Sequence, residues 1–339
     1  MRAIVITKAG GPGVLQVVER PDPEPAPGEV RVRVAFAGLN FADVMARMGL
    51  YPDAPKLPCT VGYEVSGVID RVGAGVDGLT EGDRVLALTR FGGQASVVCA
   101  AAGQVRRLPS AMSLEQGAAL PVTYLTAFHM LHRVARVRRG ARVLVHGAGG
   151  GVGVAAVQLL RREPDVVIFG TASASKHDFL RELGVHHPID YRALDYATEV
   201  RRLTGGRGVD LILDPLGGPD WSKGYDLLAP AGHLCAFGFA NMHAGATRSL
   251  GRVLSQIVRV PRWSPMKLMD DNKAVSGVNM GHLWGELELL QGEIDELLSL
   301  YDAGVIEPVI DSVFPFEQAA AAHERLESRK NAGKVLLKA

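Results

Sequence analysis

The spacing of hydrophobic positions changes along the chain, and this change predicts two kinds of structure. Residues 1–120 hold short β-branched runs such as 30–34 and 65–72, separated by segments rich in Gly and Pro. Such runs, bounded by turn residues, are typical of a β-rich fold. From about residue 116 onward, buried apolar runs alternate with stretches of helical periodicity. This alternation predicts a parallel sheet covered by helices on both faces.

The second region divides into expected strands and helices. The strands are 142–146, 166–171, 209–214 and 233–238, and the helices between them are 151–160, 176–183 and 196–203. Beyond residue 281, Ile294 and several leucines recur at helical spacing, and a strand at 334–337 follows.

The length of 339 residues and the ordinary globular composition (47% hydrophobic, 22% charged) favour two domains. We therefore expect an α/β fold in which a Rossmann domain, 123–279, interrupts a β-rich domain formed by 1–122 and 280–339. The net charge is only +1, so no overall field attracts nucleic acid or an anionic membrane. We expect no nucleic-acid partner.

The longest apolar stretch, 143–160, contains His146 and five glycines, so it predicts a strand, a turn and a helix and no membrane span. The alternating start of the chain does not resemble a signal peptide. The three cysteines are odd in number and widely spaced, which is typical of a reducing compartment. A cytoplasmic protein is expected.

A glycine-rich turn follows the strand 142–146 and opens a helix. Its central residues are Gly150, Gly151, Val152 and Gly153. Aligned to the pattern G-x-G-x-x-G, the run has alanine in place of the first glycine. The second glycine lets the backbone approach a pyrophosphate, and the third lets helix and strand pack closely. Because strand, turn and helix occur in the right order, the run predicts a dinucleotide site.

The segment after the next expected strand indicates which dinucleotide binds. An NAD site usually has an acid about twenty residues after the turn, where it binds the ribose hydroxyls. This chain has no acid from Phe169 to Ser175 and instead offers Ser173 and Lys176. Hydroxyls and a lysine favour the 2′-phosphate of NADP(H). The alternative is that the lysine is a solvated residue in the first helical turn.

The chain lacks the usual groups that polarise a simple ketone. It has no C-x-x-C pair, and Cys59, His129 and His132 form no coherent ligand pattern, so no metal is expected. None of the seven tyrosines has a lysine four residues later. The substrate is therefore expected to bring its own activation, as a quinone or a conjugated carbonyl does.

Several strings resemble the zinc-free quinone oxidoreductases of the medium-chain dehydrogenase/reductase superfamily. They are Gly38-Leu39-Asn40-Phe41-Ala42-Asp43, Gly49-Leu50-Tyr51, Gly62-Tyr63-Glu64-Val65-Ser66-Gly67, the glycine turn and Gly333-Lys334-Val335. The strings 169–177, 187–191, 214–218 and 310–313 resemble most the synaptic vesicle membrane quinone-oxidoreductase-like proteins. The similarity covers nearly the whole chain.

This resemblance implies a GroES-like catalytic domain, a Rossmann domain, a cleft between them and a homodimer. It implies that Asn40 and Tyr51 face the nicotinamide and substrate and that Thr126 lies in the nicotinamide pocket. Tyr63 stands where zinc-containing relatives have a ligand histidine. It is a candidate proton donor, and a buried structural tyrosine is the alternative.

The remaining cofactor candidates lie in or after the expected Rossmann strands. The resemblance places Ser173, Lys176 and Tyr191 around the adenosine 2′-phosphate. Phe237 and Gly238 end the strand 233–238, and Lys334 precedes the strand 334–337. The alternative for Lys334 is an exposed lysine. His186 and His187 are expected in a surface loop.

The segment 248–267 has basic residues, no acid and an apolar stripe at helical spacing. The basic residues are Arg248, Arg252, Arg259, Arg262 and Lys267, and the stripe is Leu250, Val253, Leu254, Ile257 and Val258. Such a helix either packs on its own protein, as a lid for example, or contacts an anionic membrane surface.

The sequence therefore predicts an NADPH:quinone oxidoreductase acting on quinones or conjugated carbonyls. Two alternatives stay open. One is a reductase of 2-enal or enone double bonds, and the other is a non-catalytic NADPH-binding protein that contacts a membrane or partner through 248–267.

Overall fold

The chain forms two units in a computed structural model that describes residues 1–242 and 250–339. Unit 1 consists of Met1–Leu125 together with Gly281–Ala339. Unit 2 consists of the described residues from Thr126 to Met280. Two segments far apart in the sequence therefore build unit 1, and unit 2 is inserted between them.

The β-branched runs of the first region form the sheets of unit 1, as predicted. A seven-stranded sheet has the order β14-β15-β3-β4-β5-β7, with β6 also paired to β3, and β1 pairs with β2. The strands are β1 (Arg2–Ile6), β2 (Leu15–Glu19), β3 (Glu29–Leu39), β4 (Glu64–Val72), β5 (Arg84–Leu88), β6 (Val97–Ala101), β7 (Val105–Arg107), β14 (Ile310–Pro315) and β15 (Lys334–Lys338). Val30, Val32 and Val34 on β3 are buried in the core of this unit.

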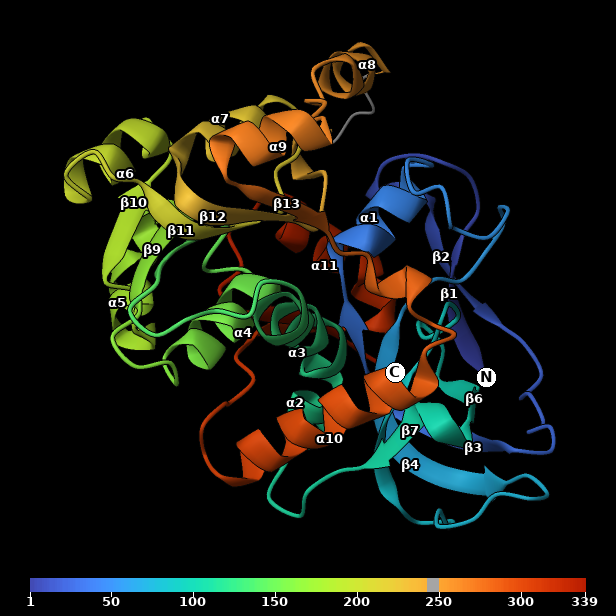
Figure 1. Cartoon of the computed structure of the whole chain (residues 1–339). Helices are drawn as coiled ribbons and strands as arrows, with labels where there is room; N and C mark the ends of the chain where they lie inside the picture. The colour runs from blue at the N-terminus through green and yellow to red at the C-terminus, as the bar shows by residue number, and fades with distance from the viewer. Residues whose placement is uncertain (243–249) are drawn as a thin grey trace. The chain divides into compact units, whose positions relative to one another are not determined.

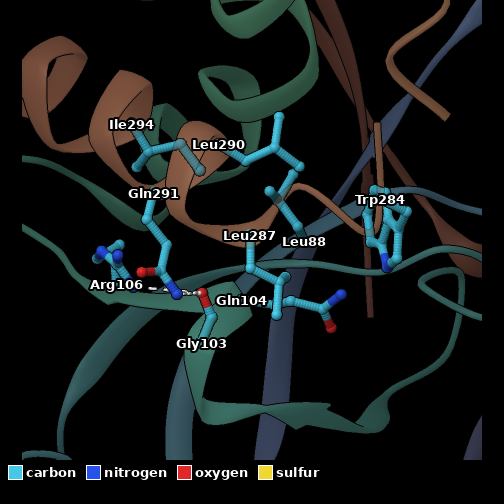
Figure 2. Close-up of a pocket in the computed structure, with 9 residues that line it drawn as sticks. All are labelled: Leu88, Gly103, Gln104, Arg106, Trp284, Leu287, Leu290, Gln291 and Ile294. Carbon is cyan, nitrogen blue, oxygen red and sulfur yellow. Dashed lines mark hydrogen bonds between the residues drawn. The ribbon is translucent and has the colours of Figure 1, made fainter. Parts of the chain in front are cut away.

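Helices cover the sheet of unit 1. They are α1 (Phe41–Arg47), α2 (Leu114–Ala119), α10 (Leu287–Asp302) and α11 (Ala319–Glu327), and α3 (Pro121–Phe128) leads into unit 2. Figure 2 shows how α10 is anchored: the Gln291 side chain points at the Gly103 carbonyl and donates a hydrogen bond of 2.8 Å. The helical spacing after residue 281 thus marks a real helix, which begins at Leu287.

Unit 2 contains a six-stranded sheet in which every neighbouring pair is parallel. The strands are β8 (Arg142–His146), β9 (Val167–Ala172), β10 (His187–Asp190), β11 (Val209–Asp214), β12 (Leu228–Ala236) and β13 (Ala274–Gly277), in the order β10-β9-β8-β11-β12-β13. The order reverses between β8 and β11, and this arrangement is that of the Rossmann fold.

Both faces of this parallel sheet carry helices (Figure 1). These helices are α4 (Gly151–Leu160), α5 (His177–Leu183), α6 (Tyr196–Leu203), α7 (Pro219–Leu227) and α9 (Pro265–Asp271), whereas α8 (Leu250–Val258) lies away from the sheet. The contacts pair α4 with α5 and α6 with α7, and the two pairs lie on opposite faces of the sheet. The predicted two-sided sheet is therefore confirmed.

Some elements differ from the predictions. His187 was expected in a loop but lies in β10, where its ring stacks on Phe169 at 4.8 Å between centroids. This edge strand contains Pro188, and proline is tolerated at an edge because one side makes no ladder hydrogen bonds. The strand expected at 233–238 begins at Leu228 and ends at Ala236.

Candidate functional site

A buried polar cluster in unit 1 joins Asn40, Glu64 and Lys334. Glu64 begins β4, Lys334 begins β15, and Asn40 follows β3, which lies between those two strands. The Lys334 ammonium donates to Asn40 Oδ1 at 2.6 Å and forms an ion pair with Glu64 Oε1. Asn40 Nδ2 donates to the same Glu64 oxygen at 2.9 Å. The sheet order therefore brings together residues that the sequence separates widely.

The environment of Glu64 is closed. Its side chain is fully buried, and its second oxygen accepts the backbone N–H of Val122 at 2.6 Å. A Cβ at Gly38 would lie 2.4 Å from Glu64 Oε1, so glycine is needed to leave room for the carboxylate. Glu64 was part of a recognised string, but the sequence did not reveal this role.

Asp43 adds a second buried carboxylate to the cluster. Its Oδ2 accepts the Asn40 backbone N–H at 2.8 Å, while its Oδ1 is buried without a hydrogen-bond partner. Burial raises the pKa of Asp43 to about 7, and the Asn40 backbone N–H and the Lys334 ammonium oppose this rise. Burial and the nearby Glu64 carboxylate therefore favour a proton on Asp43 near neutral pH.

Tyr63 and Tyr51, two of the predicted catalytic residues, pack edge to face with ring centroids 6.4 Å apart. Tyr63 is 7% exposed, and no hydrogen-bond partner lies within bonding distance and angle of its hydroxyl oxygen. Burial, followed by the charge of Asp43 and the neighbouring Tyr51, raises the pKa of Tyr63 far above its ordinary value. Tyr63 is therefore a neutral phenol that can donate a hydrogen bond, and its raised pKa makes it a weak acid.

Two hollows in unit 1 do not include these residues. The crevice in Figure 2, under α10, has a volume of about 10 Å³, room for roughly one water molecule. A larger hollow of about 430 Å³ is lined by Phe91, Cys99 and Trp284 among others. Neither lining contains Asn40, Tyr51 or Tyr63, so neither hollow is the candidate site.

In unit 2 the glycine turn joins β8 to α4. Gly150 precedes the helix and provides no side-chain cap, so the helix begins with an open backbone end at Gly151 and Val152. A Cβ at Gly153 would lie 2.4 Å from the Gly147 carbonyl oxygen, so only glycine allows this close packing. Both features suit a pyrophosphate at a helix N-terminus.

Strand β9 holds the turn in place. Thr171 Oγ1 accepts the Gly147 backbone N–H at 3.2 Å and lies 3.1 Å from His146 Nδ1. The Thr171 carbonyl accepts the Ala148 N–H at 3.1 Å. Burial lowers the pKa of His146 to about 3, so this histidine is neutral and has a structural role.

The candidate 2′-phosphate residues follow two neighbouring strands. Asp190 of β10 is in register with Ala172 of β9, so Tyr191 and Ser173 leave the sheet side by side. Ser173 Oγ lies 3.2 Å from Ser175 Oγ. The structure thus groups the hydroxyls with the predicted aromatic residue at one edge.

Two cations lie beside these residues. A Cβ on Gly149 would lie 3.6 Å from Lys176 Nζ, which places the lysine over the glycine turn. Tyr191 is 38% exposed, and the Arg192 guanidinium lies 5.9 Å from its ring centroid. Sequence reasoning missed Arg192, which looked like an ordinary charged surface residue.

The other cofactor candidates are less closely grouped. Thr126 is buried in α3, the Phe237 N–H bonds to the Asp214 carbonyl at 3.0 Å, and Gly238 packs against Pro215. Lys334 lies in unit 1, where Asn40 and Glu64 bind its ammonium. Its predicted contact with the cofactor stays a prediction.

The described part of the chain holds neither a cluster of metal ligands nor a membrane-spanning helix. Among residues 1–242 and 250–339, no group of three or more His, Cys, Asp or Glu side chains could hold a metal ion. Within the same residues, no helix is long and apolar enough to cross a bilayer.

Two family models match the chain over different ranges. Residues 26–123 match the alcohol dehydrogenase GroES-like domain, and residues 183–337 match the family described as zinc-binding dehydrogenase. The chain belongs to the medium-chain dehydrogenase/reductase superfamily.

Individual relatives give a finer comparison. The chain is 45% identical to the human synaptic vesicle membrane protein VAT-1 homolog, covering 99% of this chain and 86% of that protein. The Escherichia coli quinone oxidoreductase complexed with NADPH is 31% identical, with a TM-score of 0.88 and complete coverage of both chains. The CurK enoyl reductase is 29% identical, with a TM-score of 0.85, covering 99% of this chain and 98% of that one.

Proposed function

We propose that this protein is an NADPH-dependent oxidoreductase that reduces quinones or conjugated carbonyls without zinc. The observation that carries the cofactor assignment is the edge of unit 2 where Ser173, Lys176, Tyr191 and Arg192 gather and no acid lies in the segment 169–175. An acid there would repel a 2′-phosphate, whereas hydroxyls and cations bind it. The NADPH complex of the E. coli relative supports this proposal.

The residues of unit 2 fit a dinucleotide. The open N-terminus of α4 offers backbone N–H groups to the pyrophosphate, and Gly153 lets that helix approach the turn. Lys176 and Arg192 would neutralise the 2′-phosphate, and Tyr191 would stack on the adenine. When bound, NADPH supplies a hydride, which is a proton with two electrons.

The residues of unit 1 provide the polar contacts for the acceptor. Asn40 has an amide N–H available for the carbonyl oxygen on which negative charge develops. A quinone that gains a hydride and one proton becomes a hydroquinone. Either Tyr63 or solvent supplies that proton, and the variant Tyr63→Phe distinguishes these two sources. If Tyr63 is the donor, the variant loses turnover but still binds NADPH; if solvent is the donor, turnover persists.

The first test measures NADPH oxidation by its absorbance, with phenanthrenequinone, naphthoquinone and a 2-enal as acceptors and NADH as a control. Turnover with NADPH and a quinone supports the proposal, and NADPH binding without turnover on any acceptor contradicts it. Faster turnover of the 2-enal would favour double-bond reduction, the alternative that the similarity to an enoyl reductase supports.

The cofactor site has its own test. Lys176→Glu should raise the KM for NADPH about tenfold or more while leaving NADH almost unaffected, since a charge that binds the phosphate becomes one that repels it. Arg162→Glu makes the same charge change at the other end of α4 and should have little effect. Equal effects of the two variants would contradict the assigned phosphate site.

A second function is favoured by the exposed side chains of α8 and α9. Leu254, Val258, Met266 and Met269 are 63%, 75%, 74% and 77% exposed. Arg248 and the side chains of Leu250 and Arg252, also part of the predicted segment, lie outside the described residues. Exposed apolar and basic side chains on one segment suit a peripheral contact with an anionic membrane.

Vesicle sedimentation tests the membrane contact. Binding to anionic but not neutral vesicles, weakened by salt and by Arg259→Glu with Arg262→Glu, would support it. Arg138→Glu, an exposed charge change elsewhere in unit 2, is the control. No binding at low salt would contradict the contact.

A homodimer also stays our prediction, and analytical ultracentrifugation measures the oligomeric state.

A further inference from the structure

The side-chain amide of Asn40 is held from both sides. An ammonium can only donate hydrogen bonds, so the atom that faces Lys334 must be the amide oxygen. A carboxylate can only accept them, so the atom that faces Glu64 must be the amide nitrogen. The two charged partners therefore fix the orientation of the amide, and one of its two N–H groups stays available.

The groups that hold Asn40 are themselves fixed. Lys334 is 3% exposed and Glu64 is 0% exposed, and Val122 binds the second oxygen of the carboxylate. Asp43 accepts the backbone N–H of Asn40, which fixes the main chain at the same point. A buried ion pair contributes little net stability compared with apolar residues of the same shape. Stability alone therefore does not explain why this buried pair is charged, whereas the positioning of the Asn40 amide does.

We propose that Lys334 and Glu64 are positioning residues that lock Asn40 as a hydrogen-bond donor to the carbonyl oxygen of the substrate. This inference rests on the proposed reductase function. It narrows the substrate class to molecules that have an acceptor oxygen on or conjugated to the reacting carbon, since the fixed amide presents an N–H group. A freely rotating amide would offer its oxygen as often as its nitrogen.

A double-mutant cycle on kcat tests the inference. Lys334→Met should lower kcat for a quinone by roughly tenfold to hundredfold, less than the roughly 10²–10³-fold loss when an oriented donor is removed, because Asn40 keeps its amide and loses only its fixed orientation. In an Asn40→Ala background the same change should alter kcat by less than about twofold, because Lys334 acts through the missing amide. Lys338→Met, on the same strand but exposed, should match the wild type.

Equal losses of kcat in the two backgrounds would overturn the inference, because Lys334 would then act independently of Asn40. Unchanged activity of Lys334→Met would overturn it too. If Lys334→Met leaves Glu64 unpaired and fails to fold, the variant Glu64→Gln with Lys334→Met removes both charges. This pair should show the same dependence on Asn40.

A readout without turnover separates this inference from the proposed function. The chain has five asparagines, so labelling with ¹⁵N-asparagine gives five side-chain amide pairs. Asn40→Ala identifies the signal of Asn40, which should move and lose protection from exchange in Lys334→Met. The signal of Asn272, at the end of α9, should stay in place. An unmoved Asn40 signal refutes the positioning role, whereas absent quinone turnover refutes only the reductase function.

Discussion

Replacing Asp214 with asparagine should remove much of the pH dependence of the stability of unit 2. Asp214 ends β11 with its side chain fully buried. Its Oδ1 accepts the backbone N–H groups of Leu216 and Gly217 at 2.6 and 3.3 Å, while Oδ2 has no hydrogen-bond partner. Burial raises the pKa of Asp214 from 3.8 to about 7, against the effect of these two N–H groups.

The sign follows from proton binding. Between about pH 4 and pH 7 the unfolded chain has lost the Asp214 proton while the folded chain retains it, so stability falls as pH rises. A rise of about three pKa units corresponds to roughly 4 kcal/mol, since one unit is worth about 1.4 kcal/mol. Asparagine has the same shape as aspartate but does not ionise, so the stability of the variant should not fall over this pH range.

Denaturant unfolding followed by tryptophan fluorescence measures the effect. Trp221 and Trp263 belong to unit 2 and Trp284 to unit 1, so a Trp284→Phe background reports on unit 2 alone. From about pH 5 to about pH 8 the variant should gain about 2–3 kcal/mol relative to its parent, since about two of the three pKa units fall in this window. Asp226→Asn, an exposed change, should not. Parallel pH profiles for parent and Asp214→Asn would refute the reasoning.

Two further predictions concern packing. Gly153→Ala should weaken NADPH binding by about tenfold or more, measured by fluorescence titration, because its Cβ would lie 2.4 Å from the Gly147 carbonyl oxygen. Gly251→Ala, which meets open space, is its control, and equal affinities would contradict the prediction. Arg47→Met should destabilise unit 1 by about 3–5 kcal/mol in chemical denaturation, since it removes one charge of a buried ion pair and both guanidinium hydrogen bonds to Glu327. A loss below about 1 kcal/mol would contradict this.

The strands at the centre of unit 2 were predictable because they are buried on both faces. The apolar residues 143–145 and 211–213 form the centres of the expected strands 142–146 and 209–214, and β8 and β11 have those bounds. The edge strands β10 and β13 were missed. They are only four residues long, and β10 contains His187 and Pro188, which indicate a loop when the neighbouring strand is unknown.

The candidate site was predictable only in part. Asn40 and Tyr63 stood out because their surroundings resembled a family. The bond from Lys334 to Glu64 spans 270 residues, and no local pattern predicts which charges a sheet will bury together. Arg192 lies beside a predicted residue, but its relation to the Tyr191 ring depends on the conformation after β10.

The place of β15 in the sheet has a consequence for biosynthesis. This strand lies between β14 and β3, and Lys334 meets Asn40 across 294 residues. During translation, β3 therefore cannot pair with β15 until all of unit 2 has been synthesised. The inserted unit has its whole sheet available first, so we expect it to fold while unit 1 is still an open template. A nascent chain stalled before β15 should leave residues 36–39 of β3 unpaired on one side, while β6 already pairs with residues 29–33, and chaperones that bind unpaired strand edges would act there.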